Sequence, residues 1–92
     1  MKDLSEIRQE IDEIDREMVS LFIKRMHCSD SVAQYKISHD LEIYDASREK
    51  EKTDTLCALT QDSYEKQEIE ELFSCIMSIS RKRQYRIRDS KS

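Results

Sequence analysis

"LSEIRQEIDEIDREMVSLFIKR", residues 4–25, is the stretch of the sequence that decides the fold. Its apolar residues step by three and four, as in an amphipathic helix: Leu4, Ile7, Ile11, Ile14, Met18 and Leu21. The same rhythm continues onto Arg25, Cys28, Val32 and Tyr35. The pattern predicts one helix over about 4–37, roughly 50 Å long at 1.5 Å per residue. Because a small domain cannot cover so long an apolar stripe, we expect a partner chain.

The composition indicates an all-α fold. The chain has 92 residues, enough for one domain, and contains no Gly and no Pro, so both common helix breakers are absent. Charged residues make up 39% and aromatic residues 7%. No run alternates apolar and polar residues in the way that indicates a strand. We therefore expect a single domain over residues 1–92, built from amphipathic helices with solvated outer faces.

Two further helices follow the first. A linker over about 37–44 contains His39 and Asp40, which favour a break, and a second helix is predicted over 45–59. Asp62 and Glu65 have the spacing of a capping box. They predict the start of a third helix over 64–87, followed by a C-terminal tail over 88–92.

Charge and cysteine content restrict the function. A net charge of −4 argues against nucleic-acid binding. The sequence has no signal peptide and no long apolar run, so we expect a cytoplasmic protein and no membrane contact. Cys28, Cys57 and Cys75 lack metal-ligand spacing and predict reduced thiols on the core side. Neither a metal-ligand cluster nor a Gly-rich phosphate loop is present, and no nucleophile has an adjacent base, so no cofactor is expected.

Polar residues interrupt the inner face of every predicted helix. In the first helix Arg25 and Lys36 are eleven residues apart, about 20° in angle and roughly 16 Å along the axis. The second and third helices contribute further polar side chains at helical spacing: Asp45, Arg48, Glu49, Ser80 and Gln84. Together these residues predict a cation-rich pocket inside a helical bundle, suited to a small dicarboxylate. Such a site offers charge stabilisation and shape, without a covalent step.

Each residue also has a plainer interpretation. An arginine at a helix seam, such as Arg25, commonly extends to water. Asp45 is a typical N-cap, and Arg48 with Glu49 would serve as a surface pair. The basic stretch 81–88 is most simply a solvated helix end favoured by the dipole. His27 and His39 receive no functional role, and Tyr35 and Phe73 are most simply core residues.

Four segments carry a resemblance to a known family: "IRQEIDEIDREMVSLFIKR" (7–25), "YK" (35–36), "DASRE" (45–49) and "LFSCIMSISRKRQ" (72–84). From Leu4 to Tyr85 the chain resembles the all-helical (type II) chorismate mutases. The resemblance implies a three-helix chain that intertwines as a six-helix homodimer with shared active sites. It also implies the Claisen rearrangement of chorismate to prephenate, on the route to phenylalanine and tyrosine. One departure is the linker, since family members often carry Gly or Pro where this chain has "SHDLEIYD".

The resemblance assigns roles to the cationic residues. Arg8 matches the arginine that reaches from the partner chain to a substrate carboxylate. Arg25 matches the arginine that binds the side-chain carboxylate within its own chain. Lys36 matches the lysine that contacts the ether oxygen and a carboxylate. Helix geometry agrees with a crossing Arg8, which lies about 26 Å along the helix from Arg25 and roughly 100° out of phase.

The remaining matches are Asp45, Arg48 and Glu49, with Glu49 expected to hold the ring hydroxyl, and Ser80 with Gln84. Gln84 is expected to donate to the ether oxygen. Two alternatives stay open. An isochorismate-pyruvate lyase would share the fold, but such lyases typically lack the equivalents of Glu49 and Ser80. A non-catalytic dimerisation module would explain the apolar seam, but not the set of pocket residues.

Overall fold

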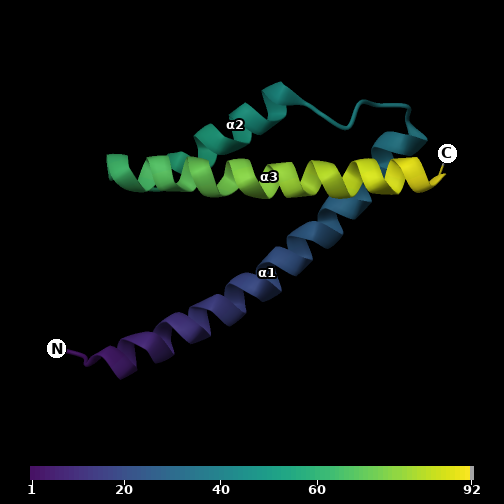
Figure 1. Cartoon of the computed structure of the whole chain (residues 1–92). Helices are drawn as coiled ribbons and strands as arrows, with labels where there is room; N and C mark the ends of the chain where they lie inside the picture. The colour runs from purple at the N-terminus through teal and green to yellow at the C-terminus, as the bar shows by residue number, and fades with distance from the viewer. Residues whose placement is uncertain (92) are drawn as a thin grey trace.

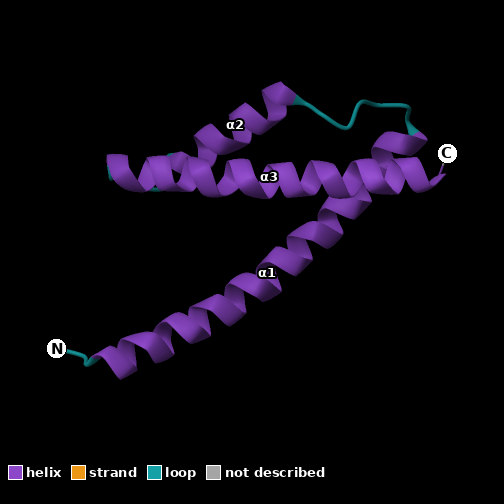
Figure 2. Ribbon diagram, viewed as in Figure 1, coloured by secondary structure: helices purple, strands orange, loops and turns teal. Residues whose placement is uncertain are grey.

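The computed structural model describes residues 1–91, which form three α-helices and no strand (Figure 2). Helix α1 spans Leu4–Ser38, α2 spans Ala46–Cys57 and α3 spans Ser63–Lys91. The predicted all-α class with a long N-terminal helix is therefore confirmed. Within residues 1–91, no helix combines the length and apolarity that crossing a membrane requires.

Helix α3 is the element that holds the chain together, since it packs against both α1 and α2. The C-terminal half of α1 crosses α3, whereas its N-terminal half projects away from the other helices (Figure 1). The principal extents are 56 × 26 × 14 Å and the radius of gyration is 16.7 Å. A compact domain of this length has a radius of gyration of about 12 Å. The single chain is thus elongated.

Little apolar surface is buried within the chain. Among the described residues the buried apolar side chains are Met26, Ala33, Ile43 and Met77. The apolar stripe predicted for the first helix is exposed along its whole N-terminal half: Leu4, Ile7, Ile11, Ile14, Met18 and Leu21. The inner seam of α1 therefore faces solvent in the single chain.

Some predicted core positions are wrong for the chain as described. Cys28 and Cys75 are exposed free thiols rather than core-side ones, and Cys57 is half-buried. The Tyr35 side chain is exposed and stacks on the His39 ring, with centroids 3.9 Å apart. These side chains are exposed because they lie on faces of α1 and α3 that no other helix of the chain covers.

Helix α1 ends in a Schellman-type arrangement without glycine. The Leu41 amide donates to the Lys36 carbonyl at 2.8 Å, and the Asp40 amide donates to the Ile37 carbonyl at 3.3 Å. This geometry requires the left-handed region at Asp40, whose φ is 55°. Aspartate tolerates that region better than most residues with a side chain. The linker can therefore turn here although the chain has no Gly.

Aspartate side chains begin both later helices. Asp45 Oδ1 accepts from the Arg48 amide at 3.0 Å and caps α2. Asp62 Oδ1 accepts from the Tyr64 and Glu65 amides, at 2.8 and 3.0 Å, at the start of α3. The reciprocal half of the predicted capping box is wrong. The Glu65 carboxylate accepts from the Thr60 hydroxyl, and the Asp62 amide donates to the same hydroxyl.

The Asp40 backbone gives a stability prediction. Asp40→Gly should raise the free energy of unfolding by up to about 1 kcal/mol, because the relief of left-handed strain, about 1–2 kcal/mol for a residue with a Cβ, exceeds the entropy cost of ordering Gly, about 0.4–1 kcal/mol. Asp40→Val should lower it, because a β-branched residue is strongly disfavoured there. Urea unfolding of both variants followed by circular dichroism measures the difference. A destabilised Asp40→Gly variant would contradict the prediction.

Candidate functional site

A pocket of about 290 Å³ lies where the C-terminal half of α1, the start of α2 and α3 meet. This volume suits a small molecule. Seven of the eight residues that the sequence assigned to a binding site line it: Arg25, Lys36, Asp45, Arg48, Glu49, Ser80 and Gln84. The structure thus brings together residues from three helices that lie up to 59 positions apart in the sequence, from Arg25 to Gln84.

Helical spacing explains how α1 and α3 present these side chains. On α1, Arg25, Ser29, Val32 and Lys36 follow one another at i, i+4, i+7 and i+11, and all of them line the pocket. On α3, the apolar face ends at the buried Met77. Ser80 and Gln84 continue that face with polar groups and are each 8% exposed. A stripe that would otherwise be core therefore becomes the wall of a polar pocket.

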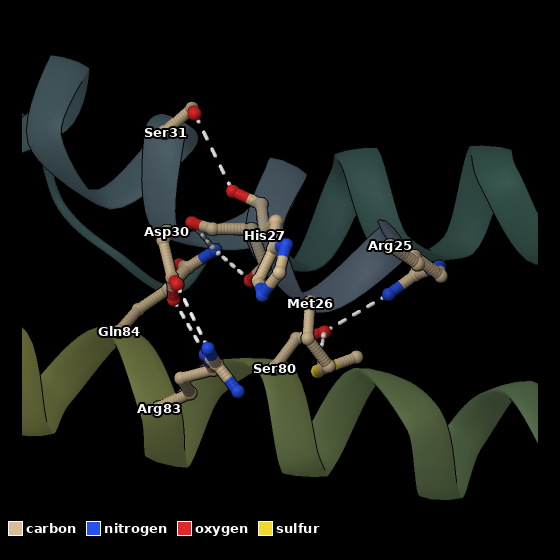
Figure 3. Close-up of polar contacts among 9 residues, drawn as sticks. Arg25, Met26, His27, Asp30, Ser31, Ser80, Arg83 and Gln84 are labelled. Carbon is tan, nitrogen blue, oxygen red and sulfur yellow. Dashed lines mark hydrogen bonds and ion pairs between the residues drawn. The ribbon is translucent and has the colours of Figure 1, made fainter. Parts of the chain in front are cut away.

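The Arg25 guanidinium is fixed by α3. Its Nη1 donates to Ser80 Oγ at 2.9 Å (Figure 3). Ser80 Oγ also lies 3.9 Å from Met26 Sδ. Because the partners of this hydroxyl are an arginine and a thioether, Ser80 has no base in place to activate it as a nucleophile. Ser80 is suited to positioning the Arg25 cation.

Lys36 connects α1 to the linker. Its Nζ donates to the Ile43 carbonyl at 2.7 Å, and the Ile43 side chain is 4% exposed. The buried Ile43 anchors the linker, and the lysine contact holds its backbone beside the pocket. An ammonium has three donors, so this bond leaves Lys36 further hydrogens for a ligand.

The Gln84 amide bridges α3 to α1. Its Nε2 donates to Ser29 Oγ at 2.8 Å and to the Ser29 carbonyl at 3.2 Å. A primary amide has two N–H donors, so both are used within the chain. A ligand acceptor that binds Gln84 has to replace one of these bonds, and the longer one to the carbonyl is the weaker.

The start of α2 supplies Asp45, Arg48 and Glu49. Asp45 has the plainer role that the sequence also allowed, because its carboxylate caps the helix. It lines the pocket as well, so capping and site lining coincide. Arg48 and Glu49 are in the first turn of α2, where the helix dipole and the free N–H groups favour negative charge. The backbone at this end of the pocket thus adds to its attraction for anions.

Sequence reasoning missed Arg81, which lines the pocket and forms an ion pair with Glu49. The hydrogen bond to Glu49 raises the pKa of the Arg81 side chain, so this guanidinium stays charged. Arg81 had been counted within a solvated basic stretch. Its spacing held the signal, because Met77, Arg81 and Gln84 fall at i, i+4 and i+7 on one face of α3.

A second arginine of the basic stretch 81–88 also forms an ion pair. Arg83 binds Asp30 of α1 through two nitrogens, with the second contact at 2.9 Å (Figure 3). This hydrogen bond to Arg83 is the main reason that the pKa of Asp30 is lowered. The interpretation of the whole stretch 81–88 as a solvated end is therefore wrong for Arg81 and Arg83.

Positive charge dominates the pocket. Its lining contains five cationic side chains and two carboxylates: Arg25, Lys36, Arg48, Lys52 and Arg81 against Asp45 and Glu49. Such an excess attracts a small anion with more than one negative charge. Within residues 1–91, no group of three or more His, Cys, Asp and Glu side chains is arranged to hold a metal ion. The arrangement can bind, orient and stabilise charge.

Arg8 is the one predicted site residue outside the pocket. It lies near the start of α1, in the exposed half that projects away from α3 (Figure 1). Along a continuous helix, Arg8 is about 26 Å from Arg25. Within one chain these two arginines cannot contact the same small ligand.

Comparison with known proteins identifies a family and a relative. The family model for chorismate mutase type II matches residues 7–85. The T-protein of Haemophilus influenzae is 43% identical over 49 residues, which cover 53% of this chain and 13% of the T-protein. The match therefore spans a small part of that relative's length. No solved structure matches.

Proposed function

Because the chain belongs to the chorismate mutase type II family, we propose that it catalyses the rearrangement of chorismate to prephenate, an isomerisation in phenylalanine and tyrosine biosynthesis. The observation that carries this proposal is the cationic pocket whose lining includes Arg25, Lys36, Glu49 and Gln84. Chorismate is a dicarboxylate with an ether oxygen and a ring hydroxyl. The pocket offers cations for its carboxylates, donors for the ether oxygen and a carboxylate acceptor for the hydroxyl.

The reaction fits the chemistry of the pocket. A Claisen rearrangement breaks one C–O bond and forms one C–C bond within the same molecule, so it needs no base, nucleophile or second substrate. Free chorismate favours an extended form, whereas the reaction needs a compact chair. Arg25, held by Ser80, and Lys36, held beside Ile43, would grip the carboxylates and select that chair.

Negative charge grows on the ether oxygen as the C–O bond breaks. Lys36 and Gln84 are the donors assigned to this oxygen. Gln84 is buried and Lys36 is half-buried, and exclusion of water strengthens such donors. Gln84 has to exchange its bond with the Ser29 carbonyl for one with the substrate. The donor role of Gln84 would then develop only when the substrate binds.

The site is proposed to be completed by Arg8 of a second copy in a homodimer. The exposed apolar stripe of α1 and the radius of gyration of 16.7 Å support association, since the single chain leaves its own seam uncovered. An antiparallel α1 of a second copy would bring its Arg8 toward Arg25. One association event would thus cover the stripe and supply the remaining cation.

The direct test is incubation of the purified protein with chorismate. Loss of chorismate absorbance, with prephenate identified by NMR, is the expected result. Arg25→Ala should lower kcat/KM by at least about 100-fold, as expected when a charged hydrogen-bonding group is removed from both substrate and Ser80. Release of pyruvate from isochorismate alone would indicate the lyase, and a folded dimer inactive on both substrates would indicate a dimerisation module.

Shared sites predict complementation between two inactive variants. Arg8→Ala and Arg25→Ala should each form nearly inactive homodimers. Equal mixing with subunit exchange should restore about one quarter of wild-type specific activity, because half of the molecules become heterodimers with one intact site each. Sedimentation should show dimers throughout. An active monomer, or no recovered activity after verified exchange, would contradict the crossing of Arg8.

Substitutions of Gln84 test whether this side chain acts by electrostatic stabilisation of the ether oxygen. Gln84→Ala should lower kcat by about 10²–10³, the usual loss for one oxyanion-type donor, with a smaller change in KM. Gln84→Glu should be poor at neutral pH, because a carboxylate repels the developing charge. Its activity should rise as pH falls and the new side chain becomes a protonated donor. The wild type is the control and should show no gain in acid, so a variant with the wild-type pH profile would remove Gln84 from the ether oxygen.

A further inference from the structure

Arg81 of α3 contacts both α2 and the linker, which line the pocket together with α1 and α3. Its guanidinium forms an ion pair with Glu49 of α2 and lies over the Tyr44 ring of the linker, 4.9 Å from the centroid. The side chains of Arg81 and Glu49 are 29% and 26% exposed. A half-buried ion pair with a stacked guanidinium is held more firmly than a surface pair, because fewer rotamers are open to it. Arg81 therefore restrains Glu49 from the α3 side.

The ion pair uses only part of the Glu49 carboxylate. Arg81 Nη1 donates to Oε1, and a carboxylate has a second oxygen and about four acceptor positions in all. An ionised carboxylate can only accept. A bound dicarboxylate that carries one hydroxyl offers it a single donor, which is that hydroxyl.

We propose that Arg81 is a positioning residue for the ring hydroxyl of the substrate. By holding one oxygen of Glu49, it keeps the other oxygen in place to accept the hydroxyl hydrogen bond. This inference rests on the proposed function and deepens it, because it names the group that selects for the position of that hydroxyl. Arg81 acts through Glu49 and does not touch the substrate carboxylates.

The decisive measurement compares two substrates. One is chorismate, and the other is a chorismate analogue with hydrogen in place of the ring hydroxyl. Arg81→Gln should lower kcat/KM for chorismate by about 10-fold to 100-fold, the range for a hydrogen bond to a charged group. For the analogue, wild type and variant should agree within about twofold, since the interaction that Arg81 supports is already absent.

Arg83→Gln is the matched control. Arg83 lies on the same helix and also forms an ion pair with a carboxylate, that of Asp30 on α1, but it is not part of the pocket lining. The control therefore removes one arginine and one ion pair from α3 without disturbing Glu49. Its kcat/KM should match the wild-type value for both substrates. Arg81→Lys, which keeps the charge, should recover part of the chorismate activity.

A double-mutant cycle between Arg81 and Glu49 gives an independent test. In a Glu49→Gln background, Arg81→Gln should cause little further loss on chorismate, because its partner is already changed. If Arg81→Gln does not fold, Tyr44→Leu against Tyr44→Phe allows the same two-substrate comparison, since only the first removes the ring under the guanidinium. Retention of fold is checked by circular dichroism and thermal unfolding.

The outcomes separate the two proposals. Equal losses on both substrates, additive losses with Glu49→Gln, or no loss at all would overturn the role of Arg81 while the enzyme activity stands. An equal loss would mean that Arg81 binds a carboxylate directly or acts only on stability. A wild-type protein that leaves chorismate unchanged would remove both the proposed function and this inference.

Discussion

The crossing of α1 over α3 is the contact on which both the fold and the pocket depend. The buried residues of α1 are Met26, Ser29 and Ala33, spaced i, i+3 and i+7 on one side of the helix. Two of them meet α3 through Ser80 and Gln84. Much of this crossing is therefore polar. Each buried polar group left without a partner would cost about 1–3 kcal/mol, so the hydrogen bonds select one register of the two helices. Among the described residues, every buried side-chain nitrogen and oxygen has a partner.

The other half of α1 has the opposite character, because its apolar stripe has nothing in the chain to pack on. A helix of 35 residues cannot be covered when only α3, of 29 residues, packs against it and does so at one end. The radius of gyration of 16.7 Å is large for the same reason, since half of α1 extends beyond the other helices. In the proposed homodimer, the apolar residues that drive association and the Arg8 that completes the site lie on the same stretch of helix. Stability and catalysis would then both depend on assembly.

The sequence predicted the parts of this arrangement that follow from helical periodicity. The face of α1 that carries Arg25 and Lys36 was predictable because 3.6-residue spacing fixes which side chains share a side. The Lys36 contact to the Ile43 carbonyl was not, since it depends on the path of the linker through a left-handed Asp40. Arg81 was missed for another reason. Arg81 lies in a stretch of eight residues, 81–88, of which five are basic, so composition suggested exposure to solvent, although its spacing from Met77 placed it on the inner face.

The prediction that Tyr35 and two of the cysteines are buried is wrong, and sequence patterns alone could not have corrected it. Periodicity identifies an apolar face but does not say whether the chain itself or another molecule covers it. Cys28 follows the apolar rhythm of α1 and still lies exposed at the edge of the pocket. The N-caps succeeded because they are local: Asp45 and Asp62 need only the amides two or three residues ahead.

The charge of the pocket affects both the stability of the folded chain and its attraction for an anionic ligand. Five cationic side chains around one small volume repel one another when no ligand is bound, and this repulsion lowers the stability of the folded state. The Arg81–Glu49 pair offsets part of that cost within the chain, because it sets a carboxylate among the cations. A dianionic ligand would offset a further part of it. Since such a ligand binds only the folded site, it stabilises that state by about 2.7 kcal/mol at a concentration 100 times its Kd. The excess of cations that weakens the empty protein is therefore the same feature that makes its occupied state stable.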